Sequence, residues 1–274
     1  MKKLLFVIFA LMLVNDVVVA QSQQIEVIDG AYQRQQYKKR PPVPLAYIRE
    51  SDVMFSWNIL RVIDLNQKPN LVFTYPKSML INTLIDALKG GELEGYLFKT
   101  EELFPENAVT SDEIIKTLES YDTLLVTNPV TLLPEQRIEK TEFNPNDVVK
   151  YRIKEEWVFD KQISTMVVRI IAIAPVQNLK SEGQVVGELP MFWVYYPAIR
   201  NIIGATEVFN WRNDGQKVSF DDIFIRRHFS SYIYKESNVK DLRIEDYAAG
   251  KDILREADKI KYKIIDFEQA LWEY

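Results

Sequence analysis

The sequence predicts an α+β protein with an extended N-terminal arm and a long C-terminal helix. Between residues 151 and 174, alternating apolar residues lead into a nearly continuous apolar run, as expected for paired strands. From 251 to 272, apolar residues recur at three- and four-residue steps, which is the period of an amphipathic helix. Three prolines at 41–44 are compatible with neither a helix nor a central strand, so an extended segment is expected there.

Residues 1–20 have the layout of a secretory signal peptide. Lys2 and Lys3 form a basic head, residues 4–14 are an apolar run, and Ala20 ends a small-residue cleavage site. The run is shorter than the roughly 20 residues that a spanning helix needs, so no direct membrane span is expected. An N-terminal core helix is the alternative, although polar residues follow Ala20 at once. The pattern predicts an exported chain, in the periplasm or outside the cell.

Residues 21–48 are predicted to form an extended arm. Polar, glutamine-rich sequence leads into a basic, proline-rich stretch that lacks a core-forming pattern. A polyproline II segment loses little entropy on docking, so we interpret the arm as a tether that lies along a partner, with a disordered leader as the alternative. The arm residues that we predict to bind a partner are Tyr32, Tyr37, Lys38, Lys39, Arg40, Pro41, Pro42 and Pro44.

The segment 49–240 is predicted to form the α+β core. Residues 51–65 contain no Gly or Pro and fit either a helix or a strand, and the length of the run favours the helix. Residues 71–75 predict a short strand, and residues 78–88 predict a helix that ends at Gly90-Gly91. Residues 128–147 contain three prolines and are expected to be rich in loops.

The clearest strand signal in this core lies at 151–174. Its second part, 166–174, is apolar except for Arg169, which is typical of a strand buried on both faces. Another strand is predicted at 191–196, and Asp214-Gly215 suits a hairpin turn. A short sequence echo between 73–76 and 192–197 leads to the hypothesis of two related halves, 49–127 and 148–240.

Residues 241–274 are predicted to form the C-terminal helix, with Gly250 interrupting the pattern near its start. One face is apolar and the other is heavily charged. A helix packed on its own domain is the first interpretation, and a helix offered to a neighbouring protein is the alternative. Because tryptophan is enriched at interfaces, Trp211 and Trp272, in segments expected at the periphery, are further candidates for partner binding.

Composition excludes several classes of function. The formal net charge of −5 argues against a nucleic-acid binder. The chain has no cysteine, which excludes disulfides, thiolate metal sites and a cysteine nucleophile. Its single histidine, His228, follows Arg226-Arg227 and is interpreted as an ordinary surface or packing residue. We therefore predict no cofactor and no metal site.

Paired carboxylates are the best remaining candidate for catalysis. Two carboxylates about 5–10 Å apart can hydrolyse a glycosidic bond. Glu155 and Glu156 are neighbours on a predicted strand and should point to opposite faces. Asp221-Asp222 precede an apolar pair, as at a helix N-terminus. The prediction is therefore a protein that is not an enzyme, with a periplasmic carboxylate-dependent hydrolase or small-ligand-binding protein as the alternative.

Three blocks of the sequence resemble a known family. They are residues 49–76, residues 189–239, and the C-terminal helix with its final Leu271-Trp272-Glu273-Tyr274. On these blocks the chain resembles the GldN/PorN proteins of gliding motility and type IX secretion, and the likeness spans essentially the whole chain after the signal peptide.

The resemblance implies a non-enzymatic, periplasmic, structural subunit that supports protein secretion and gliding. It implies a ring complex, with several copies of this chain, built with a GldK/PorK-like outer-membrane lipoprotein. It further implies contact with a GldM/PorM-like inner-membrane motor protein, and association with the outer membrane through the lipoprotein. The family carries no catalytic residues that could be assigned to this sequence.

Overall fold

A computed structural model describes residues 31, 41–96, 103, 105–118, 120–127, 134–141, 143–181, 184–210, 213 and 215–272. Contacts divide the chain into the units Met1–Gln36 and Tyr37–Tyr274, and the described helices and strands belong to the second unit. The predicted signal peptide at 1–20 lies outside the described residues.

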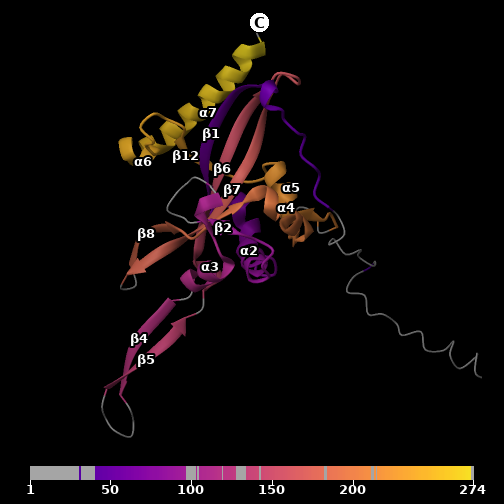
Figure 1. Cartoon of the computed structure of the whole chain (residues 1–274). Coiled ribbons are helices and arrows are strands. Elements are labelled where there is room, and N and C mark those ends of the chain that lie inside the picture. Colours follow the sequence, from indigo (N-terminus) through magenta and orange to yellow (C-terminus); the bar gives the residue numbers. More distant parts are fainter. Residues whose placement is uncertain are drawn as a thin grey trace, which may run out of the picture. The chain divides into compact units, whose positions relative to one another are not determined.

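The centre of this unit is one antiparallel sheet whose strands differ in length (Figure 1). Its strands follow the order β12-β1-β6-β7-β9-β2-β3, and β8 also pairs with β7. The strands of this sheet are β1 (Val53–Asp64), β2 (Gly95–Tyr96), β3 (Ala108–Val109), β6 (Val148–Asp160), β7 (Thr165–Ser181), β8 (Gln184–Pro190), β9 (Trp193–Tyr195) and β12 (Tyr232–Glu236). Two further two-stranded sheets consist of β4 (Ser120–Thr127) with β5 (Pro134–Thr141), and β10 (Glu207–Val208) with β11 (Val218–Ser219).

The helices are mostly short and one is long. The α-helices are α2 (Leu80–Lys89), α3 (Ser111–Leu118), α4 (Tyr196–Ala205), α5 (Phe220–Ile225), α6 (Ile244–Tyr247) and α7 (Lys251–Trp272). The 3-10 helices are η2 (Glu50–Asp52), η3 (Lys68–Thr74), η4 (Pro105–Asn107) and η5 (Pro145–Asp147). The predicted α+β class with a long C-terminal helix is confirmed.

The strand prediction at 151–174 is confirmed by β6 and β7. These strands pair antiparallel from Val148 opposite Gln177 to Asp160 opposite Thr165. Ala172, Ile173 and Ala174 are fully buried, as expected for a strand covered on both faces. The long pair forms the centre of the sheet, and β1 lies beside β6 (Figure 1).

Residues 51–65 form strand β1, so the helix that their length favoured is wrong. β1 pairs with β6 along nearly its whole length and with β12 on its other side. Consecutive residues from Ile59 to Ile63 are all buried. Ile59 clusters with residues of α7, whereas Leu60 and Val62 cluster with residues of β7, β9 and β12. Burial alternates at 53–58, as in a half-buried strand, but burial on both faces removes this alternation at 59–63. The length of the run therefore favoured the wrong element.

The strand predicted at 71–75 is also wrong, because most of this segment belongs to η3. Asn70 in η3 is fully buried. Its Nδ2 donates to the carbonyl oxygen of Asp64 at 2.7 Å and to that of Ser230 at 2.9 Å, while its Oδ1 accepts from the Ser230 amide at 2.8 Å. Ser230, which holds this turn through Asn70, lies 160 positions away in the sequence. The residues around 71–75 therefore carry no local pattern that predicts the 3-10 helix. Residues 134–141, expected as loop, likewise form strand β5.

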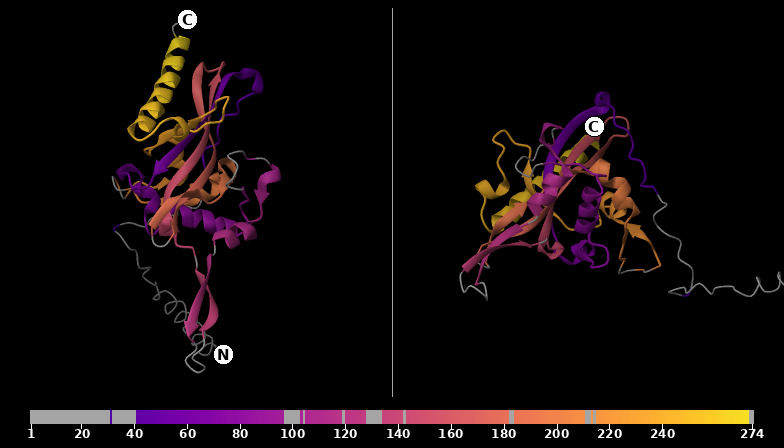
Figure 2. Two further views of the ribbon diagram at one scale, coloured as in Figure 1. Left: turned by 90° about the vertical axis from the view of Figure 1, so that its left-hand side faces the viewer. Right: turned by 60° about the horizontal axis from the view of Figure 1, so that its bottom comes forward.

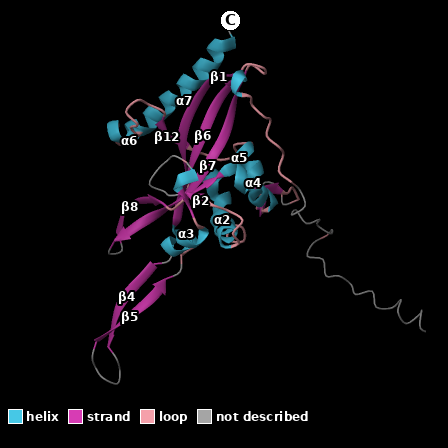
Figure 3. Ribbon diagram, viewed as in Figure 1, coloured by secondary structure: helices cyan, strands magenta, loops and turns pink. Residues whose placement is uncertain are grey.

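The main core lies between the sheet and a layer of helices. Figure 3 shows α2, α4 and α5 gathered beside the strands. Phe73, Tyr196, Phe220 and Phe224 fill the centre of this layer, and the rings of Phe73 and Phe220 stack at 6.0 Å between centroids. The predicted helix at 78–88 corresponds to α2, whose Leu80, Leu84 and Leu88 are fully buried.

Helix α7, yellow in Figure 2, lies beside the sheet and contacts β12. Its apolar residues Ala257, Ile260 and Ile264 join Ile59 of β1 and Ile233 of β12 in a separate buried cluster. Gly250 has a φ of +59°, the left-handed conformation that glycine adopts without a Cβ penalty, and it separates α6 from α7. Strands from both predicted halves, such as β1 and β6, pair within one sheet. The relation between those halves stays a hypothesis.

Removal of a buried side chain from α7 should therefore destabilise the protein. We expect Ile260→Ala to lower the free energy of unfolding by about 2–5 kcal/mol, because it removes apolar contacts and leaves a cavity. Tyr262→Ala is the matched control, since Tyr262 is 62% exposed on the same helix. Urea denaturation measures the free energy of unfolding of both variants. An equal decrease in the two would show that the face of α7 that carries Ile260 is not buried against the sheet.

Candidate functional site

The described part of the arm, residues 41–48, is held by two arginines that reach its backbone. Arg200 of α4 donates from Nη2 to the carbonyl oxygen of Val43 at 2.5 Å. Arg169 of β7 donates from Nη2 to the carbonyl oxygen of Ala46 at 2.9 Å. Both contacts use backbone acceptors, so they fix the course of the arm and leave its side chains free.

Gly204 on α4 lets the arm approach this surface closely. A Cβ atom at Gly204 would lie 3.4 Å from the Cβ of Pro42, so an alanine fits but a larger side chain meets the arm. Pro42 is half-buried, whereas Val43 and Tyr47 are 60% and 87% exposed. The arm thus lies on the body and presents apolar side chains to the surroundings.

A large side chain at Gly204 should displace the arm. We expect Gly204→Leu to increase the rate of tryptic cleavage after Arg49, because the leucine occupies the place of Pro42. Helix α4 itself should be preserved, since leucine favours a helix by roughly 1 kcal/mol over glycine. Gly204→Ala is the control and should be cleaved at the parental rate. Unchanged cleavage in the leucine variant would contradict docking of the arm at α4.

Arg200 is itself held by a buried carboxylate. Its Nε donates to Oδ1 of Asp221 at 3.0 Å and its Nη2 to Oδ2 at 2.9 Å, while the Tyr196 hydroxyl donates to Oδ1 at 2.7 Å. The side chains of Arg200 and Asp221 are 10% and 4% exposed. We call Arg200, Asp221, Tyr196 and the Val43 carbonyl the arm anchor.

Two groups of the arm anchor, Arg200 and the Tyr196 hydroxyl, have raised pKa values. Hydrogen bonding to Asp221 is the main cause that raises the pKa of Arg200 above its usual value. Burial, with the negative charge of Asp221, raises the pKa of the Tyr196 hydroxyl far above its usual range. Both groups therefore keep their protons across the ordinary pH range.

The two carboxylate pairs considered for catalysis do not form a catalytic pair. Asp221 is bound in the arm anchor, and Asp222 forms a capping box with Ser219, whose Oγ accepts from the Asp222 amide at 3.1 Å. Glu155 is fully buried, whereas Glu156 accepts from the Ser56 hydroxyl at 2.6 Å on the exposed side. The expected placement of Glu155 and Glu156 on opposite faces is confirmed.

Other ionisable groups give no better site. His228 is exposed, in agreement with its interpretation as a surface residue. Within the described parts of the chain, no three His, Asp or Glu side chains gather in a way that could hold a metal ion. The geometry thus offers no support for the hydrolase alternative.

Most residues predicted to bind a partner fall outside the described residues. These are Tyr32, Tyr37, Lys38, Lys39, Arg40 and Trp211. Trp272 is the last residue of α7, and its side chain is also not described. Pro41 and Pro44 are exposed, and Pro42 faces Gly204. Their role in partner binding stays a prediction.

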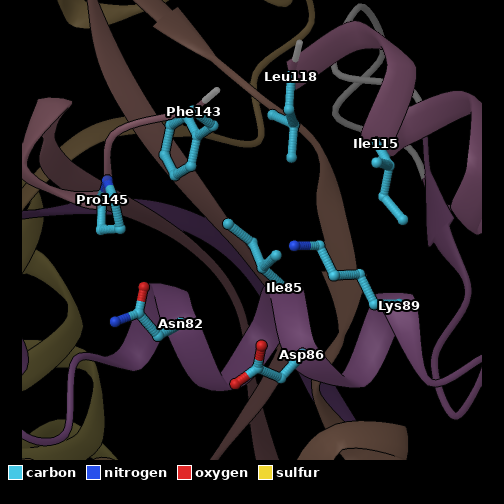
Figure 4. A pocket seen from close by; sticks show the side chains of 8 residues that line it. All are labelled: Asn82, Ile85, Asp86, Lys89, Ile115, Leu118, Phe143 and Pro145. Atoms are coloured by element: carbon cyan, nitrogen blue, oxygen red, sulfur yellow. The ribbon is translucent and has the colours of Figure 1, made fainter. Parts of the chain in front are cut away.

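A small pocket lies where α2 and α3 meet the chain that follows β5 (Figure 4). Ile115, Leu118 and Phe143 on one side face Ile85 and Lys89 of α2 on the other. Its volume is about 190 Å³. Pockets for small organic ligands usually measure roughly 300–1,000 Å³, so this one suits a single inserted side chain better than a free ligand.

Sequence reasoning missed two exposed apolar surfaces. Val185 and Val186 of β8 are 57% and 66% exposed, and Leu254 and Tyr262 of α7 are 54% and 62% exposed. The period of α7 could have placed Leu254 and Tyr262 off the buried stripe. For β8, nothing in the local sequence shows that one edge has no partner.

The model of the family described as "Gliding motility associated protein GldN" matches residues 48–273. The chain belongs to the GldN family. The resemblance seen in the sequence is thereby confirmed, and the match includes every described helix and strand. A comparison with curated proteins gave no match.

The GldN family match begins at residue 48, so it covers the core and α7 but leaves out residues 21–47 of the arm. None of the described helices combines the length and the apolar character that crossing a membrane requires. The family match makes the chain a gliding-motility-associated protein.

Proposed function

We propose that this chain is a structural, non-enzymatic subunit of the type IX secretion machinery that also supports gliding. The observation that carries the proposal is the GldN family match over residues 48–273. The arrangement of the carboxylates agrees with it, because the described Asp and Glu pairs serve an ion pair, a helix cap and the sheet interior.

The proposed location is the periplasm, at the outer membrane. The signal-peptide layout at 1–20 supports export. There the chain joins a ring with a GldK/PorK-like outer-membrane lipoprotein, which holds it at the membrane. The ring in turn meets a GldM/PorM-like inner-membrane motor protein.

The arm is the surface that we propose for the lipoprotein partner. The arm anchor and Arg169 fix the backbone of residues 43–46 through its carbonyl groups. Val43, Leu45 and Tyr47 consequently stay 60%, 37% and 87% exposed on a preformed segment. A preformed apolar segment loses less conformational entropy on binding than a free one does, which favours tight association.

Two experiments test this function. In source cells that lack the gene, both gliding and the secretion of proteins to the medium should be lost, and the full-length gene should restore them. Cells that glide and secrete normally without the gene would contradict the proposal.

Deletion of residues 21–44 tests the role of the arm. Because the core at 48–273 carries the family match, the shortened chain should fold but co-purify with the lipoprotein in a much smaller amount. The triple variant Pro41→Ala/Pro42→Ala/Pro44→Ala keeps the full length of the arm and removes only its prolines. It therefore separates the effect of the proline-fixed shape from the effect of losing the arm. Undiminished co-purification of the shortened chain would show that the arm does not bind this partner.

A further inference from the structure

Strand β8 leaves one edge of the sheet open. It pairs with β7 from Gln184 opposite Ser181 to Pro190 opposite Val176, and no second described strand pairs with it. Figure 1 shows β8 with the end of β7 as a ribbon that runs out from the sheet. Val185 and Val186 on this ribbon are more than half exposed. An open edge with exposed β-branched residues is a template for another strand.

The sequence of β8 lacks the usual protection of such an edge. Natural edge strands carry lysines, inward charges or central prolines that prevent pairing with other chains. β8 reads Gln-Val-Val-Gly-Glu-Leu-Pro, so its first half is uncharged and its proline stands at the end. Glu188, its single charge, forms an ion pair with Lys150 of β6. The first half of β8 is therefore free to accept a strand.

The hairpin of β4 and β5 in the same chain lacks a third strand among the described residues. β4 and β5 form a two-stranded sheet that joins no other described strand. An isolated two-stranded hairpin is at best marginally stable in water, and a third strand stabilises it. The hairpin therefore gains stability from any sheet edge that accepts it.

The compositions of the two hairpin strands identify the one that pairs. β5 begins at Pro134 and reads Pro-Glu-Gln-Arg-Ile-Glu-Lys-Thr, which is typical of a protected edge. β4 reads Ser-Tyr-Asp-Thr-Leu-Leu-Val-Thr and has one charge, with an uncharged run of β-branched and apolar residues at 123–127. The composition of β4 suits a strand with neighbours on both sides.

We propose that β4 of one copy of this chain adds to the open edge of β8 in a second copy. The proposal rests on the proposed function, in which several copies form a ring, and it names the contact between neighbouring copies. Each copy offers one β8 edge and donates one hairpin, so the contact is head-to-tail and continues from copy to copy until it closes. Main-chain hydrogen bonds supply affinity, and Val185 and Val186 become covered.

The absence of cysteine from the sequence makes a direct cross-linking test clean. In source cells, the gene is replaced by one encoding Val186→Cys together with one cysteine at position 123, 124, 125 or 126. Disulfides form only where the two Cα atoms approach to roughly 4.4–6.8 Å. We expect at least one of these pairs to shift the monomer band into a ladder of multiples on non-reducing gels.

A matched control pairs the same β4 cysteines with Leu254→Cys, which is 54% exposed on α7. It should give no ladder. A ladder of equal strength in this control would overturn the proposal, as would its absence from all four β8–β4 pairs. Dimers from Val186→Cys alone would show that two β8 edges pair instead, and a compact cross-linked monomer would show pairing within one chain. Either the dimer or the compact monomer would also overturn the proposed contact between β4 of one copy and β8 of another.

A charge on the open edge gives an independent readout. Val185→Lys/Val186→Lys should leave the melting temperature unchanged, because both side chains are exposed, but the protein extracted from source cells should no longer sediment as an assembly. Leu254→Lys is the control and should assemble normally. Normal assembly of the β8 variant would contradict the proposed contact. Loss of gliding and secretion on gene deletion is scored separately, so the proposed function stands or fails on its own.

Discussion

Replacement of Asp221 by alanine is expected to lower the free energy of unfolding by about 3–5 kcal/mol, the usual loss when one partner of a buried ion pair is removed. The cause is that Arg200 and the Tyr196 hydroxyl stay in the interior without their acceptor. The arm should also loosen, because Arg200 then has no fixed position from which to hold the Val43 carbonyl. Urea denaturation measures the first effect and tryptic cleavage after Arg49 measures the second.

The neighbouring residue supplies the control. Asp222→Ala removes part of a helix cap, which typically costs about 1 kcal/mol, and should leave the arm in place. The double variant Arg200→Met/Asp221→Leu should be more stable than Asp221→Ala, because an apolar pair often replaces a buried ion pair without loss. It should nevertheless release the arm. A similar small loss for Asp221→Ala and Asp222→Ala would mean that the arm anchor contributes little.

The second large effect is expected at Glu155, the fully buried carboxylate of β6. Its Oε2 accepts from Nε1 of Trp157 at 3.0 Å, and its Oε1 lies 2.9 Å from Nη1 of Arg227. Burial lowers the pKa of nearby Arg61, and the charge of Glu155 opposes that shift. We expect Glu155→Ala to cost about 3 kcal/mol, the lower end for a buried pair, because Arg227 is 31% exposed and can turn toward water.

Glu156→Ala is the matched control for this position. Glu156 is the next residue on β6, but it lies on the more exposed side and contacts the Ser56 hydroxyl. Its loss should cost less than about 1 kcal/mol, as is usual for exposed polar contacts. Thermal and urea unfolding measure the loss of stability in both variants. If the two variants unfold alike, the burial of Glu155 has no energetic importance.

The parts of the fold that sequence predicts well are those held by their own periodicity. α7 has a regular apolar stripe with Ile260 and Ile264 on it, and β6 alternates over most of its length. Such patterns report which face of an element is buried, and this is local information. The helix interruption at Gly250 was predictable for the same reason, since a positive φ favours glycine.

The parts that sequence misses depend on distant partners. At 59–63, β1 is buried on both faces only because distant parts of the chain cover it. Residues of α7 pack on Ile59, and residues of β7, β9 and β12 pack with Leu60 and Val62. η3 depends on the contacts of Asn70 with Ser230. In the arm anchor, Arg200 stands within an amphipathic helix and Asp221 at a helix start, so each has an ordinary local interpretation. Only the fold brings the two together.

In the proposed function, this chain works as one subunit of a large assembly. The most direct test is the native mass of the full-length protein, gently extracted from source cells together with whatever it binds. We expect a particle many times heavier than the 32.1 kDa chain, containing the lipoprotein partner. Recovery of the protein from intact extracts at the mass of a single chain, without that partner, would contradict this role.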